Sequence, residues 1–143
     1  MLIGLDPLLG PDLLHALRAM GHGDDLVLAD ANFPAQSVGR RVIRADDCDL
    51  PRLLAAVLKV LPIDQFEPGA AVGMEVVGDR LRRESVHADI ERLLTANARP
   101  RASLELIERH AFYARARNAF AVVATGERRF YGNVILRKGT IDP

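Results

Sequence analysis

Residues 20–34 read MGHGDDLVLADANFP. The unbroken apolar run from Leu26 to Ala29 is typical of a strand that is buried on both faces of a parallel sheet. His22 precedes this run and Asp30 follows it. Ligands of open α/β sheets bind at the loops that follow the carboxyl ends of the strands. We therefore expect His22 and Asp30 to lie at one rim of the sheet, where they can move protons on a small polar substrate without a metal or a cofactor.

Strands and helices alternate along the rest of the chain. Further strands are expected at residues 42–45, 70–77, 104–107, 120–124 and 131–136, and helices are expected to begin near residues 11, 49, 86 and 111. This alternation predicts a single three-layer α/β/α domain over residues 1–143, with a mixed, mostly parallel six-stranded sheet. The link between the last two strands contains Gly126 and is too short for a crossover helix, so these two strands are expected to form an antiparallel pair.

The overall composition argues against several classes of partner. The 19 Lys and Arg residues balance the 19 Asp and Glu residues, and a net charge of zero gives no attraction to nucleic acid or to an anionic membrane. Zero net charge also favours self-association. Cys48 is the only cysteine, which rules out an internal disulfide and fits a reducing cytoplasm. The chain shows no signal-peptide pattern and no apolar run near the roughly 20 residues of a membrane helix.

Metal and nucleotide chemistry are also not indicated. The four histidines show no spacing typical of metal ligands, so no metal site is expected. No glycine-rich phosphate-binding motif is present, so no nucleotide cofactor is expected.

His22 and Asp30 are the first candidates for a functional role. His22 stands between two glycines, which leave its imidazole uncovered, and histidine titrates near neutral pH as a general acid or base requires. Its alternative role is that of a surface turn residue. Asp30 could accept hydrogen bonds from sugar hydroxyls or hold an imidazole in one tautomer. Its alternative role is to cap a turn.

The closing third of the chain supplies the other candidates. Arg109 follows an expected strand, and its guanidinium could bind hydroxyl or ring oxygens, although a surface salt bridge is the alternative. Tyr131, Gly132 and Asn133 open the last expected strand. The Tyr ring and hydroxyl and the Asn amide match the apolar faces and hydroxyls of a sugar. The alternative is a hairpin turn in which Gly132 provides backbone freedom. The remaining charges near these motifs are expected to be solvated: Asp24, Asp25, Arg115, Arg117, Arg128 and Arg129.

Taken together, six segments of the chain resemble the L-fucose mutarotase and D-ribose pyranase family. They are MGHGD (20–24), DANFPA (30–35), RHAFY (109–113), TGE (125–127), YGN (131–133) and LRKG (136–139). They cover nearly the whole chain in matching order and spacing. The Asn-Phe-Pro-Ala and Ala-Phe-Tyr stretches resemble the fucose branch more than the ribose branch.

The resemblance implies a six-stranded α/β fold and a homo-oligomeric ring of about ten subunits. It also implies sites near subunit contacts and interconversion of sugar anomers without a cofactor. Carried over by position, His22 transfers protons, and Asp30, Arg109 and the segment from Tyr131 to Asn133, including Gly132, hold the sugar. The chain departs from the fucose pattern at His110 and Gln36, which would affect sugar preference if they line the pocket.

Four functions are compatible with these residues. The first is an L-fucose mutarotase in which His22 shuttles a proton, with Asp30 or Tyr131 as its partner. The second is the same chemistry on D-ribose. The third is a monosaccharide-binding module without catalytic activity, and the fourth is an oligomeric structural protein without a small-molecule pocket.

Overall fold

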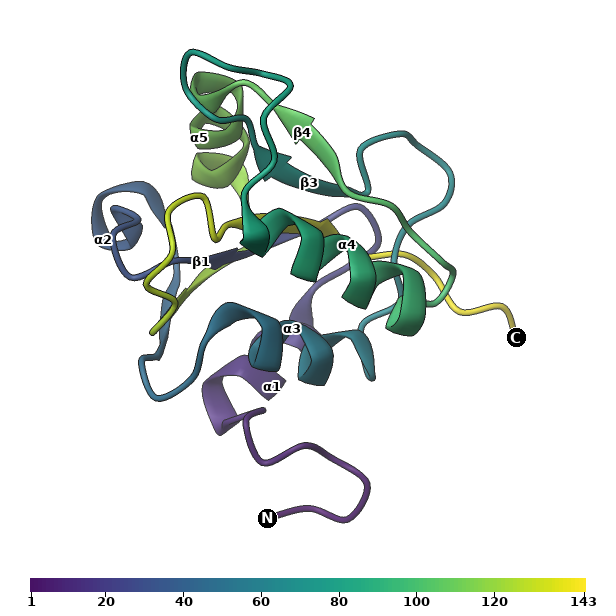
Figure 1. Cartoon of the computed structure of the whole chain (residues 1–143). Helices are drawn as coiled ribbons and strands as arrows, with labels where there is room; N and C mark the ends of the chain where they lie inside the picture. Colours follow the sequence, from purple (N-terminus) through teal and green to yellow (C-terminus); the bar gives the residue numbers. More distant parts are fainter.

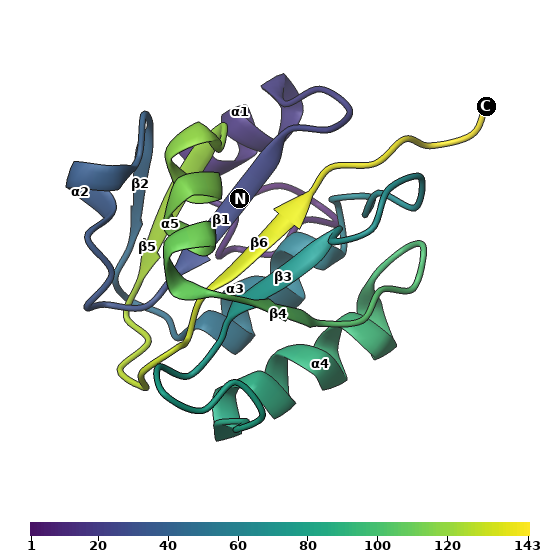
Figure 2. The same cartoon turned by 90° about the horizontal axis from the view of Figure 1, so that it is seen from above.

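A six-stranded sheet with the strand order β2-β5-β1-β6-β3-β4 forms the middle layer of the computed structural model, which describes residues 1–143 (Figure 2). The strands are β1 (Asp25–Ala29), β2 (Val42–Ala45), β3 (Ala71–Met74), β4 (Glu105–Ile107), β5 (Ala121–Thr125) and β6 (Val134–Arg137). β6 runs antiparallel to both of its neighbours, β1 and β3, and the other pairs are parallel. The predicted mixed, mostly parallel sheet is therefore confirmed.

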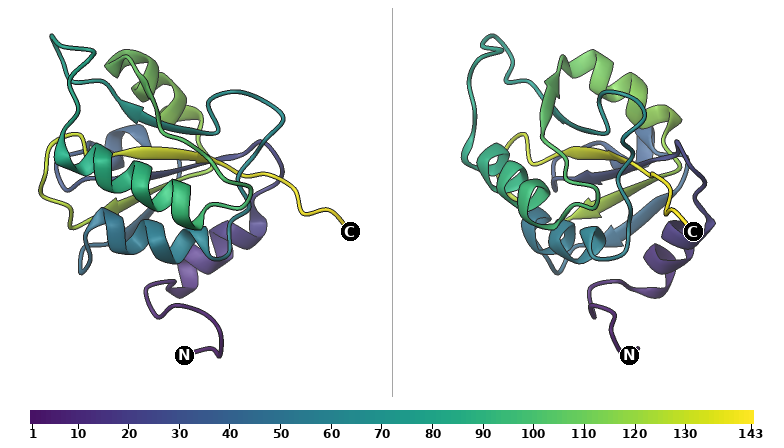
Figure 3. Two further views of the ribbon diagram at one scale, coloured as in Figure 1. Left: turned by 45° about the vertical axis from the view of Figure 1, so that its right-hand side comes forward. Right: turned by 90° about the vertical axis from the view of Figure 1, so that its right-hand side faces the viewer.

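Helices cover both faces of this sheet (Figures 1 and 3). One face carries α1 (Pro11–Ala19), α3 (Leu50–Leu58) and α4 (Ser85–Asn97), and the other carries α2 (Ala35–Val38) and α5 (Arg109–Asn118). The side chains of β1 alternate between the two layers, because successive residues of a strand point to opposite faces. Leu26 and Leu28 belong to the larger core and Val27 and Ala29 to the smaller one. The expected three-layer arrangement is thus confirmed.

The expected pairing of the last two strands is wrong. β5 and β6 are not neighbours, because β1 lies between them and pairs with both. The link that follows β5 instead crosses the end of β1, where the Ala31 N–H donates to the Glu127 carbonyl oxygen at 2.8 Å. β1 is apolar and buried from Leu26 to Ala29 and has hydrogen-bonded neighbours on both edges, so it lies in the interior of the sheet.

Two further elements differ from the sequence prediction. The last strand begins at Val134 rather than Tyr131, so the Tyr-Gly-Asn segment lies in the turn before it. The single-turn helix α2, Ala35–Val38, was not expected from the sequence. Four residues are too few to show a helical period of apolar residues.

Asp25 and Arg115 were expected to be solvated, but both are largely buried in an ion pair. Asp25 is the first residue of β1, and its two carboxylate oxygens accept from Nε and Nη2 of Arg115, both at 2.7 Å. Their side chains are only 13% and 19% exposed. This two-point ion pair ties α5 to the start of β1, a long-range contact that spacing along the chain does not reveal.

None of the helices is both long and apolar enough to cross a membrane.

Candidate functional site

The carboxyl ends of β1, β3 and β4 and the amino end of β6 meet at one edge of the sheet, because β6 runs against the other three. A pocket of about 370 Å³ opens there. This volume falls in the range of about 300–1,000 Å³ typical of small-molecule sites. The pocket is lined by Asp30, Asn32, Phe33, Met74, Val77, Arg109, Tyr113, Phe130, Tyr131 and Asn133. Four of the predicted residues, from opposite ends of the chain, therefore share one cavity.

Asp30 and Asn133 form the floor of this pocket. The Asn133 amide group donates to Asp30 Oδ2 at 2.9 Å, and the Asp30 N–H donates to Asn133 Oδ1 at 3.0 Å. Asp30 Oδ1 also accepts from the Asn32 N–H at 2.9 Å, so Asp30 does cap the turn that follows β1. Each carboxylate oxygen can accept more than one hydrogen bond. Asp30 thus keeps the capacity to accept a ligand hydroxyl while it holds the turn.

The environment of Asp30 favours its neutral form. Burial raises the pKa of its carboxyl group, and the hydrogen bonds from Asn32, Asn133 and Phe33 only partly offset this effect. The nearby charge of Glu127 raises the pKa further. A carboxyl group with a raised pKa is better suited to exchange a proton near neutral pH than an ordinary aspartate.

Tyr131 has an unusual backbone conformation. Its φ is +62°, and it is the only residue other than glycine with a positive φ. Such a conformation in a bulky residue is strained by about 1–3 kcal/mol and clusters at functional sites. The Tyr131 hydroxyl oxygen accepts from the Val77 N–H at 3.2 Å, which leaves its own proton free to be donated. The strained turn thereby places a hydroxyl donor at the pocket.

Gly132 is required for space rather than for backbone freedom, which corrects the hairpin interpretation. Its φ is not in the left-handed region, but a Cβ atom there would lie 2.6 Å from Glu127 Cγ. The Glu127 side chain cannot swing away, because Arg129 holds both of its carboxylate oxygens. The close approach of the two segments therefore demands glycine at this position.

Gly132→Ala is expected to lower the free energy of unfolding by about 1–3 kcal/mol, the usual cost of overpacking a rigid site. Urea unfolding measures this loss directly. Gly21→Ala is the matched control, because a Cβ at Gly21 meets only Asp24 Oδ2 at 3.7 Å. Equal stability of the two variants would contradict the steric argument.

Glu127 and Arg129 form an ion pair beside the turn that contains Gly132. Nε and Nη2 of Arg129 donate to Glu127 at 3.0 and 2.9 Å, and Nη1 donates to Asp89 at 2.8 Å. The Glu127 side chain is 3% exposed. The expectation that Arg129 is a solvated surface residue is therefore wrong. The Arg129 hydrogen bonds lower the pKa of Glu127, against the opposing effect of burial.

This ion pair predicts a loss of stability in acid. A carboxylate whose pKa is lowered by folding stabilises the protein above its unfolded pKa and loses that contribution as the pH falls through its folded pKa. The free energy of unfolding should therefore fall as the pH drops below about 4.5, the ordinary value for glutamate. Urea unfolding at several pH values should show a shallower decline in Glu127→Gln and in Arg129→Gln. An unchanged slope in both variants would rule out this pair as a source of the pH dependence.

The helix α5 carries Arg109 to the mouth of the pocket. Glu108 caps this helix by accepting from the N–H groups of His110 and Ala111, so Arg109 is its first residue. The Arg109 side chain is exposed and has no salt bridge within the chain, unlike the alternative considered for it. A free guanidinium at a pocket mouth is available to bind ligand oxygens.

An aromatic wall, formed by Phe33 and Tyr113, was not expected from the sequence. The two rings are stacked with their centroids 5.4 Å apart. Tyr113 lies four residues after Arg109 on the same helix, a spacing that places both side chains on one face and could have identified it. Together with Met74 and Val77, the wall gives the pocket an apolar side in addition to its polar floor.

His22 lies at the other edge of the sheet, so the expectation of one rim shared with Asp30 is wrong within a single chain. His22 precedes β1 and Asp30 follows it, and the five residues of β1 span roughly 17 Å. The His22 imidazole is 49% exposed, and its Nε2 lies 3.2 Å from Asp64 Oδ1. The pocket edge collects residues that follow the parallel strands or precede the antiparallel strand β6, whereas His22 precedes the parallel strand β1 and therefore lies at the opposite edge.

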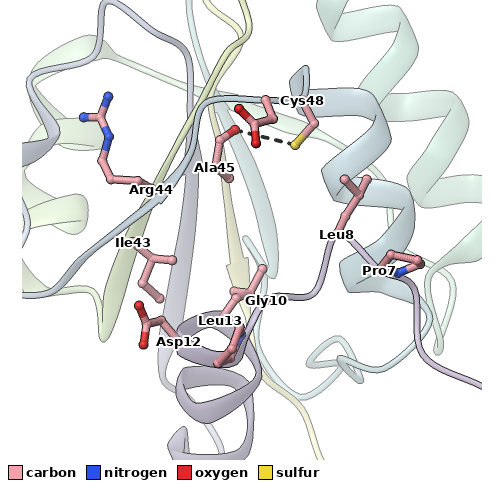
Figure 4. A pocket seen from close by; sticks show the side chains of 11 residues that line it. Pro7, Leu8, Gly10, Asp12, Leu13, Ile43, Arg44, Ala45 and Cys48 are labelled. Carbon is pink, nitrogen blue, oxygen red and sulfur yellow. Dashed lines mark hydrogen bonds between the residues drawn. The ribbon is translucent and has the colours of Figure 1, made fainter. Parts of the chain in front are cut away.

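A larger hollow of about 450 Å³ lies between the N-terminal segment and the start of α1, and it contains none of the predicted site residues. His110 and Gln36 are exposed and do not line the pocket. A hollow of about 250 Å³ lies between the N-terminal segment, the start of α1 and β2, and it contains none of the predicted site residues (Figure 4). No cluster of three or more His, Cys, Asp or Glu side chains is arranged to hold a metal ion.

The fold and the pocket define an α/β protein with a small-molecule site at its strand ends. Residues 3–141 match the RbsD / FucU transport protein family. The chain is 51% identical to the fucose mutarotase of Homo sapiens, over 96% of this chain and 93% of that protein. It is 48% identical to the fucose mutarotase of Danio rerio, over 100% and 96% of the two chains. The chain therefore belongs to the RbsD / FucU family.

Solved structures are similar over the whole chain. A fucose mutarotase from Streptococcus pneumoniae in complex with L-fucose superposes with a TM-score of 0.91 at 35% identity, covering 99% of this chain and 100% of that one. RbsD from Bacillus subtilis complexed with D-ribose has a TM-score of 0.74 at 21% identity, covering 99% and 100%. The second similarity concerns the fold alone.

Proposed function

We propose that this protein is an L-fucose mutarotase, an isomerase that interconverts the α and β anomers of L-fucose without a cofactor. The observation that carries the proposal is the single pocket in which Asp30, Arg109, Tyr131 and Asn133 converge beside an apolar wall. The similarity to fucose mutarotases over nearly the whole chain supports the same substrate. L-Fucose is a 6-deoxy sugar, so it offers a methyl group to the apolar wall and hydroxyls to the polar floor.

The pocket residues suit this sugar chemistry. Mutarotation removes a proton from the anomeric hydroxyl and delivers one to the ring oxygen; the ring opens to the aldehyde, the carbonyl rotates and the ring closes. Arg109, Asn133 and Asp30 hold the sugar oxygens, and Tyr131 or Asp30 exchanges one proton. Because the reaction already proceeds in water, acid–base catalysis of about 10²–10⁴-fold is sufficient.

His22 is the second proton-transfer group in this proposal, and it reaches the pocket from a neighbouring copy of the chain. Within one chain it lies at the opposite edge of the sheet, yet it is half exposed and stands beside Phe66, which is 66% exposed. Phe130 and Val77, which line the pocket, are 73% and 57% exposed. Contact between these two apolar surfaces would bury them and close the pocket with an imidazole.

A ring-shaped homo-oligomer of about ten subunits would repeat this contact around a closed symmetry. We place this assembly in the cytoplasm, in line with the single, buried cysteine, Cys48. The mass of the assembly follows from light scattering coupled to size-exclusion chromatography. A monomer at micromolar concentration would contradict the shared site.

One-dimensional exchange NMR tests the proposed reaction. The exchange rate between the anomers of L-fucose is expected to rise when protein is added, and the rise for D-ribose is expected to be smaller. A larger effect on D-ribose would favour a pyranase. Stabilisation of the protein by L-fucose without faster exchange would identify a sugar-binding module instead. The absence of both effects for a panel of monosaccharides would contradict every sugar-directed function.

A further inference from the structure

His87 carries the only buried side-chain polar atom in the chain that lacks a hydrogen-bond partner, its Nε2. The residue lies in the first turn of α4 and is 1% exposed. A buried polar group without a partner costs free energy, because it gives up water and gains nothing in exchange. The proposed reaction assigns no role to His87, so a histidine at this position calls for an explanation.

The other ring nitrogen of His87 caps α4. Nδ1 accepts from the Glu84 N–H at 3.0 Å. A neutral imidazole that accepts at one nitrogen carries its hydrogen on the other, which here is Nε2. Glutamine or glutamate ordinarily makes this bond from the third position of a helix, and neither would leave a ring nitrogen unpartnered. The helix cap alone therefore does not account for histidine.

The surroundings of His87 keep the imidazole neutral. Burial lowers its pKa, and the positive charge of Arg83 lowers it further. The backbone of Met74 and the charge of Glu84 act in the opposite direction, but the pKa is lowered overall. The capping bond to Nδ1 is therefore retained at neutral pH.

The ring of His87 lies beside Tyr131. The two ring centroids are 6.2 Å apart and the ring planes meet at 46°. This separation falls within the range of about 4.5–7 Å that is typical of aromatic pairs. The start of α4, the loop after β3 and the turn before β6 meet at the same end of the molecule (Figure 2). Because His87 is buried and Tyr131 only partly so, the imidazole supports the phenol from the protein interior.

Two irregularities of the structure are thus in contact. Tyr131 is the only residue other than glycine with a positive φ, and its neighbour His87 has the only unpartnered buried nitrogen. A strained backbone conformation persists only where the surroundings hold it in place. The hydroxyl of Tyr131 accepts from the Val77 N–H, and its ring packs against His87. Both contacts act on the side chain that the turn presents to the sugar pocket.

We propose that His87 is a positioning residue whose ring holds the Tyr131 phenol at the pocket while its Nδ1 caps α4. Phenylalanine would offer the ring without an acceptor, and glutamine would offer the acceptor without a ring. Histidine supplies both, and the unpartnered Nε2 is the consequence. The inference rests on the proposed mutarotase function for its effect on kcat, but not for its effect on Tyr131.

Two variants separate the ring from the acceptor. His87→Gln keeps the acceptor and should lower kcat for L-fucose about two- to tenfold, the scale of one aromatic pair, with a smaller change in KM. His87→Phe keeps the ring and should retain kcat while losing stability in urea. A residue that only caps the helix would give the reverse order. Ile90→Val is the matched control: Ile90 is buried on the same helix in the larger core, whereas Tyr131 packs against the smaller core.

A double-mutant cycle tests whether His87 acts through the Tyr131 hydroxyl. Tyr131→Phe removes the hydroxyl and keeps the ring. In this background, His87→Gln should cause no further loss of kcat. Losses that multiply would overturn the proposal. This cycle decides the question even if the larger ring of His87→Phe disturbs the fold.

Hydrogen exchange provides a readout that does not need activity. Because the Val77 N–H is bonded to the Tyr131 hydroxyl, its exchange rate reports the position of the phenol. His87→Gln should raise this rate toward that of Tyr131→Phe, and Ile90→Val should leave it unchanged. Wild-type kcat together with wild-type Val77 exchange in His87→Gln would overturn the proposal. If the wild type does not accelerate anomer exchange, the proposed function fails, and the Val77 measurement still decides the role of His87.

Discussion

His22→Ala should lower the protein-catalysed rate of L-fucose anomer exchange by about 10²–10⁴-fold, the usual contribution of a positioned acid or base. The half-exposed imidazole has a polar contact with Asp64 and an edge-on ring contact with Phe66 in its own chain. Its removal should therefore leave the fold and the sugar pocket in place. Saturation-transfer NMR between the anomeric signals measures the rate, and stabilisation by L-fucose in a thermal melt should persist.

His15→Ala is the matched control for this experiment. His15 is also an exposed histidine, on α1, and it does not line the sugar pocket. It should retain the wild-type exchange rate. A His22→Ala protein that exchanges L-fucose at the wild-type rate would remove His22 from the mechanism, although the pocket could still bind the sugar.

Mixing two inactive variants should restore activity if the site is shared between subunits. Arg109→Ala removes a sugar ligand from the pocket, and His22→Ala removes the imidazole, so each homo-oligomer should be nearly inactive. In mixed assemblies, an Arg109→Ala subunit supplies an intact His22 to the intact pocket of a His22→Ala subunit. Random co-assembly of equal amounts should produce about one quarter of the wild-type sites in a symmetric ring.

Co-expression of the two variants with different affinity tags allows the mixed assemblies to be purified in two steps. The control carries both substitutions in one chain and wild type in the other. Such assemblies should also retain about one quarter of their sites, because both partners of a site must be wild type. If His22 instead served the pocket of its own chain, the first mixture would stay inactive and the second would reach about one half.

The sheet illustrates how far the sequence could be used to predict the fold. The apolar run of β1 and the alternation of strands with helices are local patterns, and both led to the correct three-layer architecture. The position of β6 is not local. The short link after β5 crosses β1 instead of forming a hairpin, because β1 is buried from Leu26 to Ala29 and takes a hydrogen-bonded neighbour on each edge.

The charged residues show a similar limit. Asp25 and Arg115 looked like surface residues because each is polar and stands near a turn or on a helix with a weak apolar stripe. The two residues are 90 positions apart in the sequence, so only the packing of α5 on β1 reveals that they form an ion pair. Asp64 escaped notice for the same reason, since its contact with His22 spans 42 positions.

The sequence alone therefore determined the class of fold, the residue types of the site and the family resemblance, because these depend on short patterns of apolar, glycine and polar residues along the chain. Only the tertiary structure decided which of those residues meet. Strand direction brings Asp30, Arg109, Tyr131 and Asn133 to one edge of the sheet and leaves His22 at the other, beside Asp64. The physical reason is that a strand carries the residues before and after it to opposite edges, and its pairing partners are chosen by burial rather than by proximity in sequence.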